Sequence, residues 1–298
     1  MSLIPKKLAI YYGYPSGVNG TFGVNAAANV FKDYDLVVFG AGLEDTSHPD
    51  YENTKNIIAH VDLTNTKVFG YIDATLPLDT IQGKIDQWAA TGVKGIFLDQ
   101  FGYDFGVSRT KQREILWCIH EKGSGNLLAF VNAWNPDDVF GSANDATFNP
   151  SGLSPNIKPS DIYLAESFAI KNGAFDDDDL NTNGIKDWQD KANKLVAYRS
   201  TFGTKIAAIA TTGSIPFDQN KADYSYFASI LNKFNYWGWG EEFFSASSGS
   251  LPFVTRKPFL GTEFKGDIIV NNGKYQRRTN AGISLDTTNH TVDFIVDG

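Results

Sequence analysis

Eight short apolar segments, separated by stretches with helical periodicity, constrain the fold of this chain more than any other feature. Apolar strands that alternate with crossover helices are typical of a parallel sheet. The predicted strands are Leu8–Gly13, Leu36–Gly40, Val68–Ile72, Gly95–Leu98, Leu127–Asn132, Ile162–Ala165, Lys205–Ala210 and Tyr236–Gly240. Because one barrel of eight strands and eight helices uses about 250 residues, we predict an α/β fold, a (β/α)8 TIM barrel.

The segments between these strands carry helical patterns of varying strength. Pro77 precedes one of them and Gly92 follows it, which matches the preference for Pro early and Gly just past a helix. The predicted helices are Asn25–Lys32, Tyr51–His60, Leu78–Thr91, Ser108–Lys122, Ile185–Phe202 and Ala222–Phe234, with a weak one after Pro136. The stretch from Asn135 to Ser160 is rich in Asn, Pro, Ser and Gly, so we expect a long loop there.

After Ser245 the pattern changes to alternating polar and apolar residues, which predicts a small all-β appendage. Its predicted strands are Phe264–Val270, Lys274–Arg278, Ile283–Asp286 and Val292–Val296. We therefore divide the chain into a (β/α)8 barrel domain over 1–246 and a C-terminal β-strand extension over 247–298.

Two acids follow apolar strands at the barrel edge where active sites lie. Asp99 ends the fourth predicted strand and Glu166 follows the sixth. An acid at the end of a buried strand loses solvation unless something there uses its charge. Strands four and six are two places apart, so these side chains should lie close across the barrel mouth. We interpret them as catalytic; the alternatives are a helix cap or cation pair for Asp99, and a salt bridge to a cation such as Arg199 for Glu166.

Other polar and aromatic side chains at the strand ends are typical of a carbohydrate site. Aromatic faces stack on sugar rings, while carboxylates and amides bind hydroxyl groups. The predicted substrate-binding residues are Tyr12, Tyr14, Asp73, Gln100, Asn132, Trp134, Trp239 and Glu241. Asp73 has an alternative role, which is to tie down the third loop.

The residues around both acids resemble the endo-α-1,4-polygalactosaminidase and spherulin-4-like group of glycoside hydrolases. The resemblance rests on the segments Ile10–Ser16, Gly95–Gly102 and Asp161–Ser167 and covers roughly residues 7 to 245. It implies a retaining, two-carboxylate glycosidase that degrades an α-linked, galactosamine-type polysaccharide. By fold-level analogy with α-galactosidase barrels, Asp99 is then the nucleophile and Glu166 the acid/base. Members of the group often have Asp-Glu after strand four, whereas this chain has Gln100.

Charge and composition exclude several other classes. A net charge of −8 and a single cysteine disfavour nucleic acid binding and exclude an intrachain disulfide. The four histidines are scattered, so zinc is not expected, and no organic cofactor is implied. No apolar run reaches the roughly 20 residues of a membrane span. No signal peptide is visible, whereas members of the group that the chain resembles are usually secreted. We expect an extracellular protein, or a virion protein released by lysis, over a cytoplasmic one.

The segment from Asp179 to Asp190 has the spacing of a calcium loop. Oxygen-bearing side chains stand at positions one, three, five, nine and twelve, Gly184 stands at position six, and a backbone carbonyl is expected at seven. The predicted ligands of this structural Ca²⁺ are Asp179, Asn181, Asn183, Ile185, Asp187 and Asp190. The alternative is a solvated acidic loop before a helix.

Two rival functions remain open from the sequence. A non-catalytic barrel that binds glycan, for example in a phage tail or at a cell surface, would show the same strand-end residues. An aldolase or isomerase is less favoured, because no Lys stands at a strand end for a Schiff base and no phosphate-binding Gly run follows the seventh strand.

Overall fold

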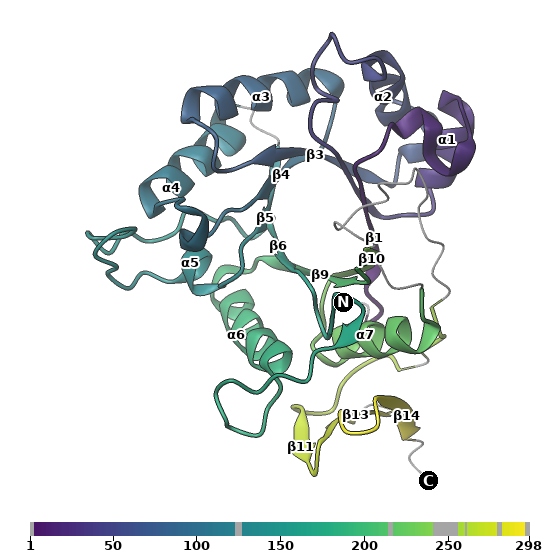
Figure 1. Ribbon diagram of the computed structural model, residues 1–298, viewed down its shortest axis with the longest axis vertical. Helices are drawn as coiled ribbons and strands as arrows, with labels where there is room; N and C mark the ends of the chain where they lie inside the picture. Colours follow the sequence, from purple (N-terminus) through teal and green to yellow (C-terminus); the bar gives the residue numbers. More distant parts are fainter. Residues whose placement is uncertain are drawn as a thin grey trace.

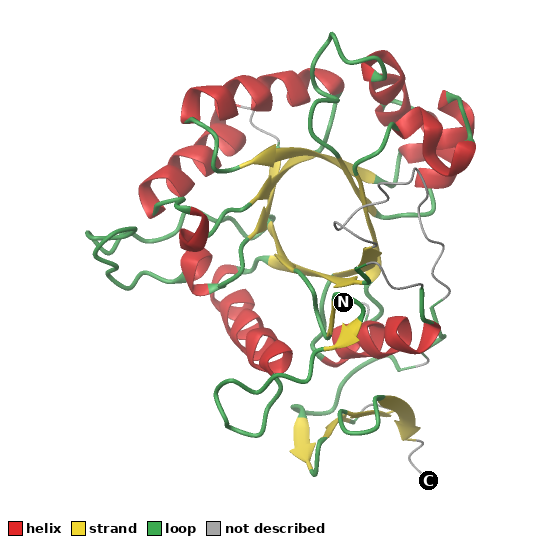
Figure 2. Cartoon of the chain, in the orientation of Figure 1, coloured by secondary structure: helices red, strands yellow, loops and turns green. Residues whose placement is uncertain are grey.

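Eight parallel strands close into a barrel, which confirms the predicted TIM-barrel fold. The structure, a computed structural model, describes residues 3–122, 127–213, 217–240, 256–259, 261–278 and 282–295. The strand order around the barrel is β1-β10-β9-β6-β5-β4-β3-β2, and Figure 2 shows the closed ring with helices outside it. The barrel strands are β1 Lys6–Tyr11, β2 Leu36–Phe39, β3 Lys67–Asp73, β4 Gly95–Asp99, β5 Leu128–Asn132, β6 Ile162–Ala165, β9 Lys205–Thr211 and β10 Tyr236–Gly240.

The helices fall where the sequence periodicity places them, with shifts of a few residues at their ends. Ser108 caps its helix by accepting a hydrogen bond from the Lys111 N–H, and Gly92 ends another with φ +90°. The α-helices are α1 Val24–Phe31, α2 Tyr51–Ile58, α3 Leu78–Thr91, α4 Arg109–Trp117, α5 Asp137–Phe140, α6 Asp187–Phe202 and α7 Gln219–Leu231. Shorter elements are the 3-10 helices η1 Pro15–Gly20, η2 Val61–Leu63 and η3 Tyr103–Phe105, the π-helical turn η4 Cys118–Lys122, and strands β7 Ile170–Lys171 and β8 Ala174–Phe175.

The observed elements differ from the predicted ones in two places. The helix expected over Ser108–Lys122 is α-helical only to Trp117 and then widens into the π-helical turn η4. The β7–β8 hairpin lies in a stretch where no strand was predicted, and its turn uses Gly173 with φ +76°. The weak helix expected after Pro136 is present as the single turn α5.

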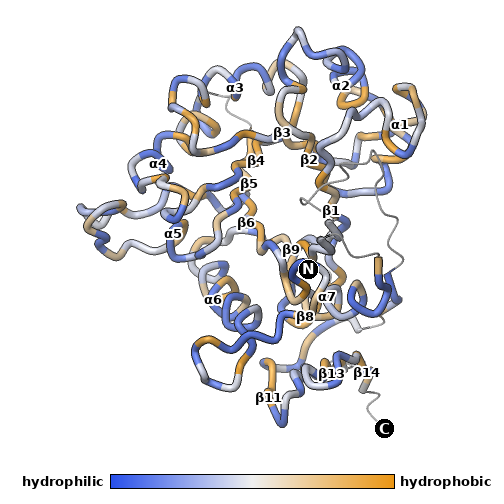
Figure 3. Tube along the Cα trace, viewed as in Figure 1, coloured by the Kyte–Doolittle hydropathy of each residue, from blue (hydrophilic) through white to orange (hydrophobic). Residues whose placement is uncertain are grey.

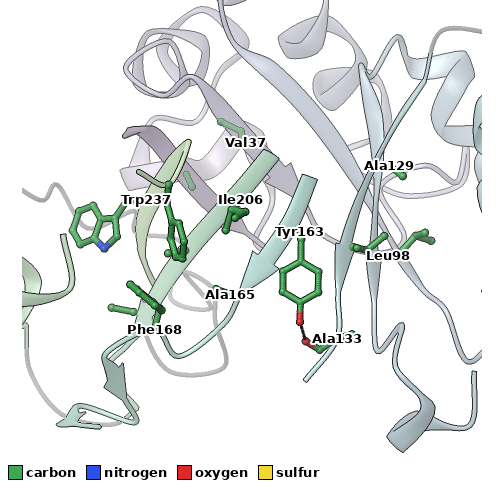
Figure 4. Packing of buried hydrophobic residues seen from close by; sticks show 14 of the residues in the cluster. Val37, Leu98, Ala129, Ala133, Tyr163, Ala165, Phe168, Ile206 and Trp237 are labelled. Carbon is green, nitrogen blue, oxygen red and sulfur yellow. Dashed lines mark hydrogen bonds between the residues drawn. The ribbon is translucent and has the colours of Figure 1, made fainter. Parts of the chain in front are cut away.

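Alternating strand residues build two separate apolar clusters. Side chains on one face of each strand fill the barrel interior, including Phe69, Phe97 and Phe130, whose rings meet edge to face. Side chains on the other face belong to an outer cluster that also contains helix residues, and Figure 4 shows Leu98, Tyr163 and Ile206 of this cluster. Both faces are therefore apolar, and strands such as β4 and β5 carry the hydrophobic colour over most of their length in Figure 3.

Gly70 of β3 is required by the helix that covers it. A Cβ atom at this position would lie 2.1 Å from Cδ2 of Trp88, a fully buried side chain on α3 whose Nε1 donates to the Tyr71 carbonyl. We expect Gly70→Ala to lower the free energy of unfolding by about 3 kcal/mol, because the indole cannot move without breaking that hydrogen bond. Urea unfolding measures the change, and Gly83→Ala, whose new methyl group meets nothing within 4 Å, is the control. Equal stability of the two variants would contradict this account.

The C-terminal residues form a four-stranded antiparallel sheet, as predicted. Its strands are β11 Ile269–Asn271, β12 Lys274–Arg277, β13 Gly282–Asp286 and β14 Thr291–Ile295. The first strand begins later than the expected Phe264 because Gly266 adopts φ +115°, which interrupts extended backbone. The predicted domain boundary at 246/247 falls outside the described residues.

This sheet packs on the barrel rather than standing apart from it. Figure 1 shows β13 and β14 beside α7, and the rings of Phe227 and Phe294 meet at 5.2 Å. The Lys186 N–H, just before α6, donates to Tyr275 Oη at 2.7 Å, and His290 Nε2 lies 2.9 Å from Asp177 Oδ2. The sheet therefore contacts the segment that joins β6 to α6. Within the described residues, no helix combines the length and the apolar character that crossing a bilayer requires.

Candidate active site

Asp99 and Glu166 meet at the mouth of the barrel through one amide group. Asn132, at the end of β5, lies between their two strands, and its Nδ2 donates to Asp99 Oδ1 at 2.9 Å and to Glu166 Oε2 at 2.5 Å. The two carboxylate oxygens therefore lie no further apart than the sum of these distances, about 5.4 Å. The two acids predicted from the sequence and the predicted amide thus form one group.

Two tyrosines lie beside this group, Tyr71 on β3 and Tyr12 directly after β1. The Tyr71 hydroxyl donates to Asp99 Oδ2 at 3.0 Å, and the ring of Tyr12 meets the ring of Tyr71 edge to face at 5.3 Å. Burial and then the Asp99 charge raise the pKa values of both phenols, so both stay protonated at neutral pH. Asp99 therefore accepts hydrogen bonds from Tyr71, from Asn132 and from the Gln100 N–H, which hold both of its oxygens in place.

Glu166 differs from Asp99 in its environment. Burial raises the pKa of the Glu166 carboxyl, and the charge of Asp99 acts in the same direction. The hydrogen bond from Asn132 and the charge of Lys191 oppose that rise in pKa without cancelling it. Glu166 therefore holds a proton at a higher pH than an ordinary Glu does.

The backbone turns sharply directly after each acid. Gln100 has φ +55° and Ser167 has φ +53°, both in the left-handed region that side chains other than Gly rarely adopt. Such a conformation costs about 1 kcal/mol or more, and it persists only where the surrounding structure enforces it. The residue directly after each acid is therefore strained. Such strain is typical of functional sites, where the surrounding structure fixes side-chain positions at a cost in stability.

Two cavities adjoin the acids. The narrower one, of about 140 Å³, lies inside the barrel mouth and is lined by Ile10, Tyr12, Phe97, Asp99, Asn132, Leu164, Glu166 and Ile209. The wider one, of about 360 Å³, lies beside the β6–α6 segment and has Trp134, Trp188 and Lys191 in its wall. Glu166 is the one described residue that lines both cavities.

Other predicted substrate-binding residues lie further from the acids. Asp73 is level with Asp99 in the sheet, but its Oδ1 accepts from the N–H and hydroxyl of Thr75, so it ties down the third loop, as the alternative proposed. The ring of Tyr14 packs on His48 and lines neither cavity. Gln100 contributes its backbone N–H to Asp99.

Trp239 is not brought to the acids. Residues of β10 alternate in direction, so Tyr236 belongs to the interior cluster and Trp239 to the outer one, where it packs on Phe217 at 5.3 Å. Glu241 lies outside the described residues, so its predicted role stays a prediction.

The predicted calcium loop is closed by its own side chains. Asp179 accepts hydrogen bonds from the N–H groups of Asn183 and Gly184. The side-chain amides of Asn181 and Asn183 both donate to Asp190 Oδ2, at 3.0 and 2.9 Å. Positions one, three, five and twelve thus converge. No group of three or more His, Cys, Asp or Glu residues suited to a metal ion occurs among the residues that the structure describes.

Sequence reasoning missed two residues near the acids. Tyr71 lies inside β3 rather than after it, and only its position two residues before Asp73, on the same face of the strand, signals that it points inward. Lys191 lies on α6, far along the chain from any strand end, and no local pattern marks it.

Comparisons with known proteins identify neither a family nor a function for this chain. No protein-family model matches this chain, and no curated protein does. Among solved structures, the carboxyl transferase domain of Rhizobium etli pyruvate carboxylase is similar with a TM-score of 0.48 and 11% identity, over 80% of this chain and 40% of that one. Type I 3-dehydroquinate dehydratase from Clostridium difficile has a TM-score of 0.42 and 8% identity, over 80% of this chain and 84% of that one. The chain thus spans less than half of the first protein's length, and likeness at this level says nothing about the reaction.

Proposed function

We propose that this barrel is a retaining glycoside hydrolase acting on an α-linked, galactosamine-type polysaccharide, with Asp99 as nucleophile and Glu166 as acid/base. The observation that carries the proposal is the shared amide of Asn132, which keeps the nearest oxygens of the two acids within about 5.4 Å. Retaining glycosidases have their two carboxyl groups about 5 to 5.5 Å apart, whereas inverting ones leave about 6.5 to 9.5 Å for a water molecule.

The chemistry of the two acids follows from their contacts. Asp99 would attack the anomeric carbon as the glycosidic C–O bond breaks, and Glu166 would pass its proton to the leaving oxygen. Since Glu166 Oε2 accepts from Asn132, that proton belongs on Oε1. In the second step the Glu166 carboxylate takes a proton from water, whose oxygen bonds to the anomeric carbon and releases Asp99.

The direct test is release of reducing ends from an α-1,4-linked galactosamine polymer. We expect soluble oligosaccharides and new reducing ends from the purified protein, with the α-configured product formed first, as NMR of the anomeric proton reports. A protein that binds the polymer and releases no reducing ends would instead be the non-catalytic glycan-binding barrel.

The Asp179–Asp190 loop is a candidate structural calcium site beside this chemistry. The convergence of Asn181, Asn183 and Asp190 supports the proposal, because side chains at these positions supply Ca²⁺ ligands in loops of this spacing. Both amide nitrogens now face Asp190, so binding an ion would require each amide to turn its oxygen inward. The loop follows the strand that positions Glu166, so an ion there would order one wall of the site.

We expect millimolar Ca²⁺ to raise the melting temperature by several degrees, since a ligand that binds only the folded state stabilises it. Asp190→Asn should remove the shift, whereas Asp86→Asn, an exposed change on α3, should keep it. Calorimetry without heat of binding, together with an unchanged melting temperature, would leave the acidic loop as a solvated one.

A further inference from the structure

Glu166 separates two spaces of different character. On one side lies the narrow cavity that also contains Asp99, and on the other lies the wider cavity beside the β6–α6 segment. An acid that protonates a leaving oxygen must lie between the sugar ring under attack and the group that departs. With Asp99 confined to the narrow cavity, the ring under attack belongs there, and the departing group belongs on the far side of Glu166.

The wall of the wider cavity combines a flat apolar surface with hydrogen-bond donors. Trp134 is 53% exposed, and the ammonium groups of Lys171 and Lys191 lie 5.2 and 5.0 Å from its ring centroid. Trp188 lines the same cavity, and its buried indole Nε1 has no acceptor among the described residues. A ligand with many hydroxyl groups would accept hydrogen bonds from the two ammonium groups beside Trp134.

Acceptors are present in the same wall. Asp176 and Asp178 line the cavity together with the lysines. Burial lowers the pKa of Lys191 to about 8, while the charges of Glu166, Asp104 and Asp176 oppose that fall and the charge of Lys171 adds to it. Lys191 thus stays largely a donor at neutral pH. An indole face between donors and carboxylates suits a pyranose ring, and a cavity of about 360 Å³ lies within the usual range for small ligands.

We propose that the wider cavity is the leaving-group subsite, where a pyranose ring stacks on Trp134 and its hydroxyl groups bind Lys171 and Lys191. This inference rests on the proposed glycosidase function and deepens it. It also explains why Glu166 is the acid/base and Asp99 the nucleophile, because Glu166 borders both subsites and Asp99 borders only one.

The test compares a substrate whose leaving group is a sugar with one whose leaving group is fluoride. An α-1,4-linked galactosamine tetrasaccharide needs the leaving-group subsite, whereas the α-fluoride of galactosamine does not, because fluoride departs without a sugar. We expect Trp134→Ala to lower kcat/KM on the tetrasaccharide about tenfold or more and to change it less than twofold on the fluoride. Trp117→Ala, which removes a 49% exposed indole on α4, should leave both rates unchanged.

Equal losses on both substrates, or no loss on the tetrasaccharide, would overturn the subsite. A binding measurement separates this failure from failure of the proposed function. In the Glu166→Gln background, calorimetry should show tetrasaccharide binding that Trp134→Ala weakens about tenfold and Lys191→Met weakens as well. Binding that neither change affects overturns the subsite alone, whereas no binding by the Glu166→Gln protein overturns the glycosidase proposal and the subsite with it.

Discussion

Asp99→Asn should lower kcat on a galactosamine polymer by about 10⁴-fold or more, because the amide cannot form the covalent bond to the anomeric carbon. Asn fits the same space, and its one amide oxygen can still accept from Asn132 and from the Gln100 N–H at the position of Asp99 Oδ1, while only the bond from Tyr71 to Oδ2 is lost. We therefore expect the melting temperature to stay within a few degrees of the original. Release of reducing ends at fixed polymer concentration measures the loss of activity.

The variant also distinguishes a nucleophile from a residue that merely binds the ring. If Asp99 is the nucleophile, the α-fluoride of galactosamine should be turned over as slowly as the polymer, since both need the covalent bond. Asp33→Asn, an exposed change after α1, serves as the control. Full activity of Asp99→Asn on a substrate that the native protein cleaves would remove the assignment.

Glu166→Gln should affect the two substrates differently. On the polymer we expect a loss of about 10² to 10⁴-fold, because Gln cannot protonate the leaving oxygen. Fluoride needs little proton assistance, so the first step on the α-fluoride should survive and a covalent adduct should accumulate, which mass spectrometry of the intact protein detects. Glu52→Gln, on the exposed side of α2, should change neither rate.

The pH dependence adds a second readout for Glu166. The acid must be protonated, so kcat/KM of the native protein should fall as pH rises through the raised pKa of Glu166, and this limb should be absent in Glu166→Gln. Because the folded-state pKa lies above the unfolded value, the stability that protonation contributes is present at low pH and lost as pH rises through the folded pKa. At pH 7 Glu166→Gln should therefore melt at a higher temperature than the native protein. A lower melting temperature would contradict burial as the cause of the shift.

Much of the fold was predictable because two signals agree. Apolar runs such as Ile162–Ala165 mark strands, and capping residues such as Ser108 and Gly92 mark helix ends, so each element is specified locally. The rule that barrel chemistry follows strand ends then selected Asp99, Asn132 and Glu166, which the structure brings together through one amide.

The same rule failed where the direction of a side chain, rather than its distance from the strand end, decides whether it reaches the site. Trp239 stands near a strand end, but alternation along β10 turns it toward Phe217 and into the outer cluster. Lys191 could not be found at all, because its approach to Glu166 depends on how α6 packs against the β6–α6 segment. Contacts of that kind are tertiary and leave no local pattern.

The C-terminal sheet changes how the protein can be shortened. The Tyr275 hydroxyl accepts a hydrogen bond from the Lys186 N–H. The ring of Tyr275 also packs 5.5 Å from the ring of Trp188, which lines the wider cavity. Cutting the gene after the last barrel strand to obtain a minimal enzyme would uncover this indole and release the segment leading into α6. The C-terminal sheet thus supports one wall of the wider cavity, and we expect a trimmed protein to lose the shape of that wall while Asp99 and Glu166 keep their contacts.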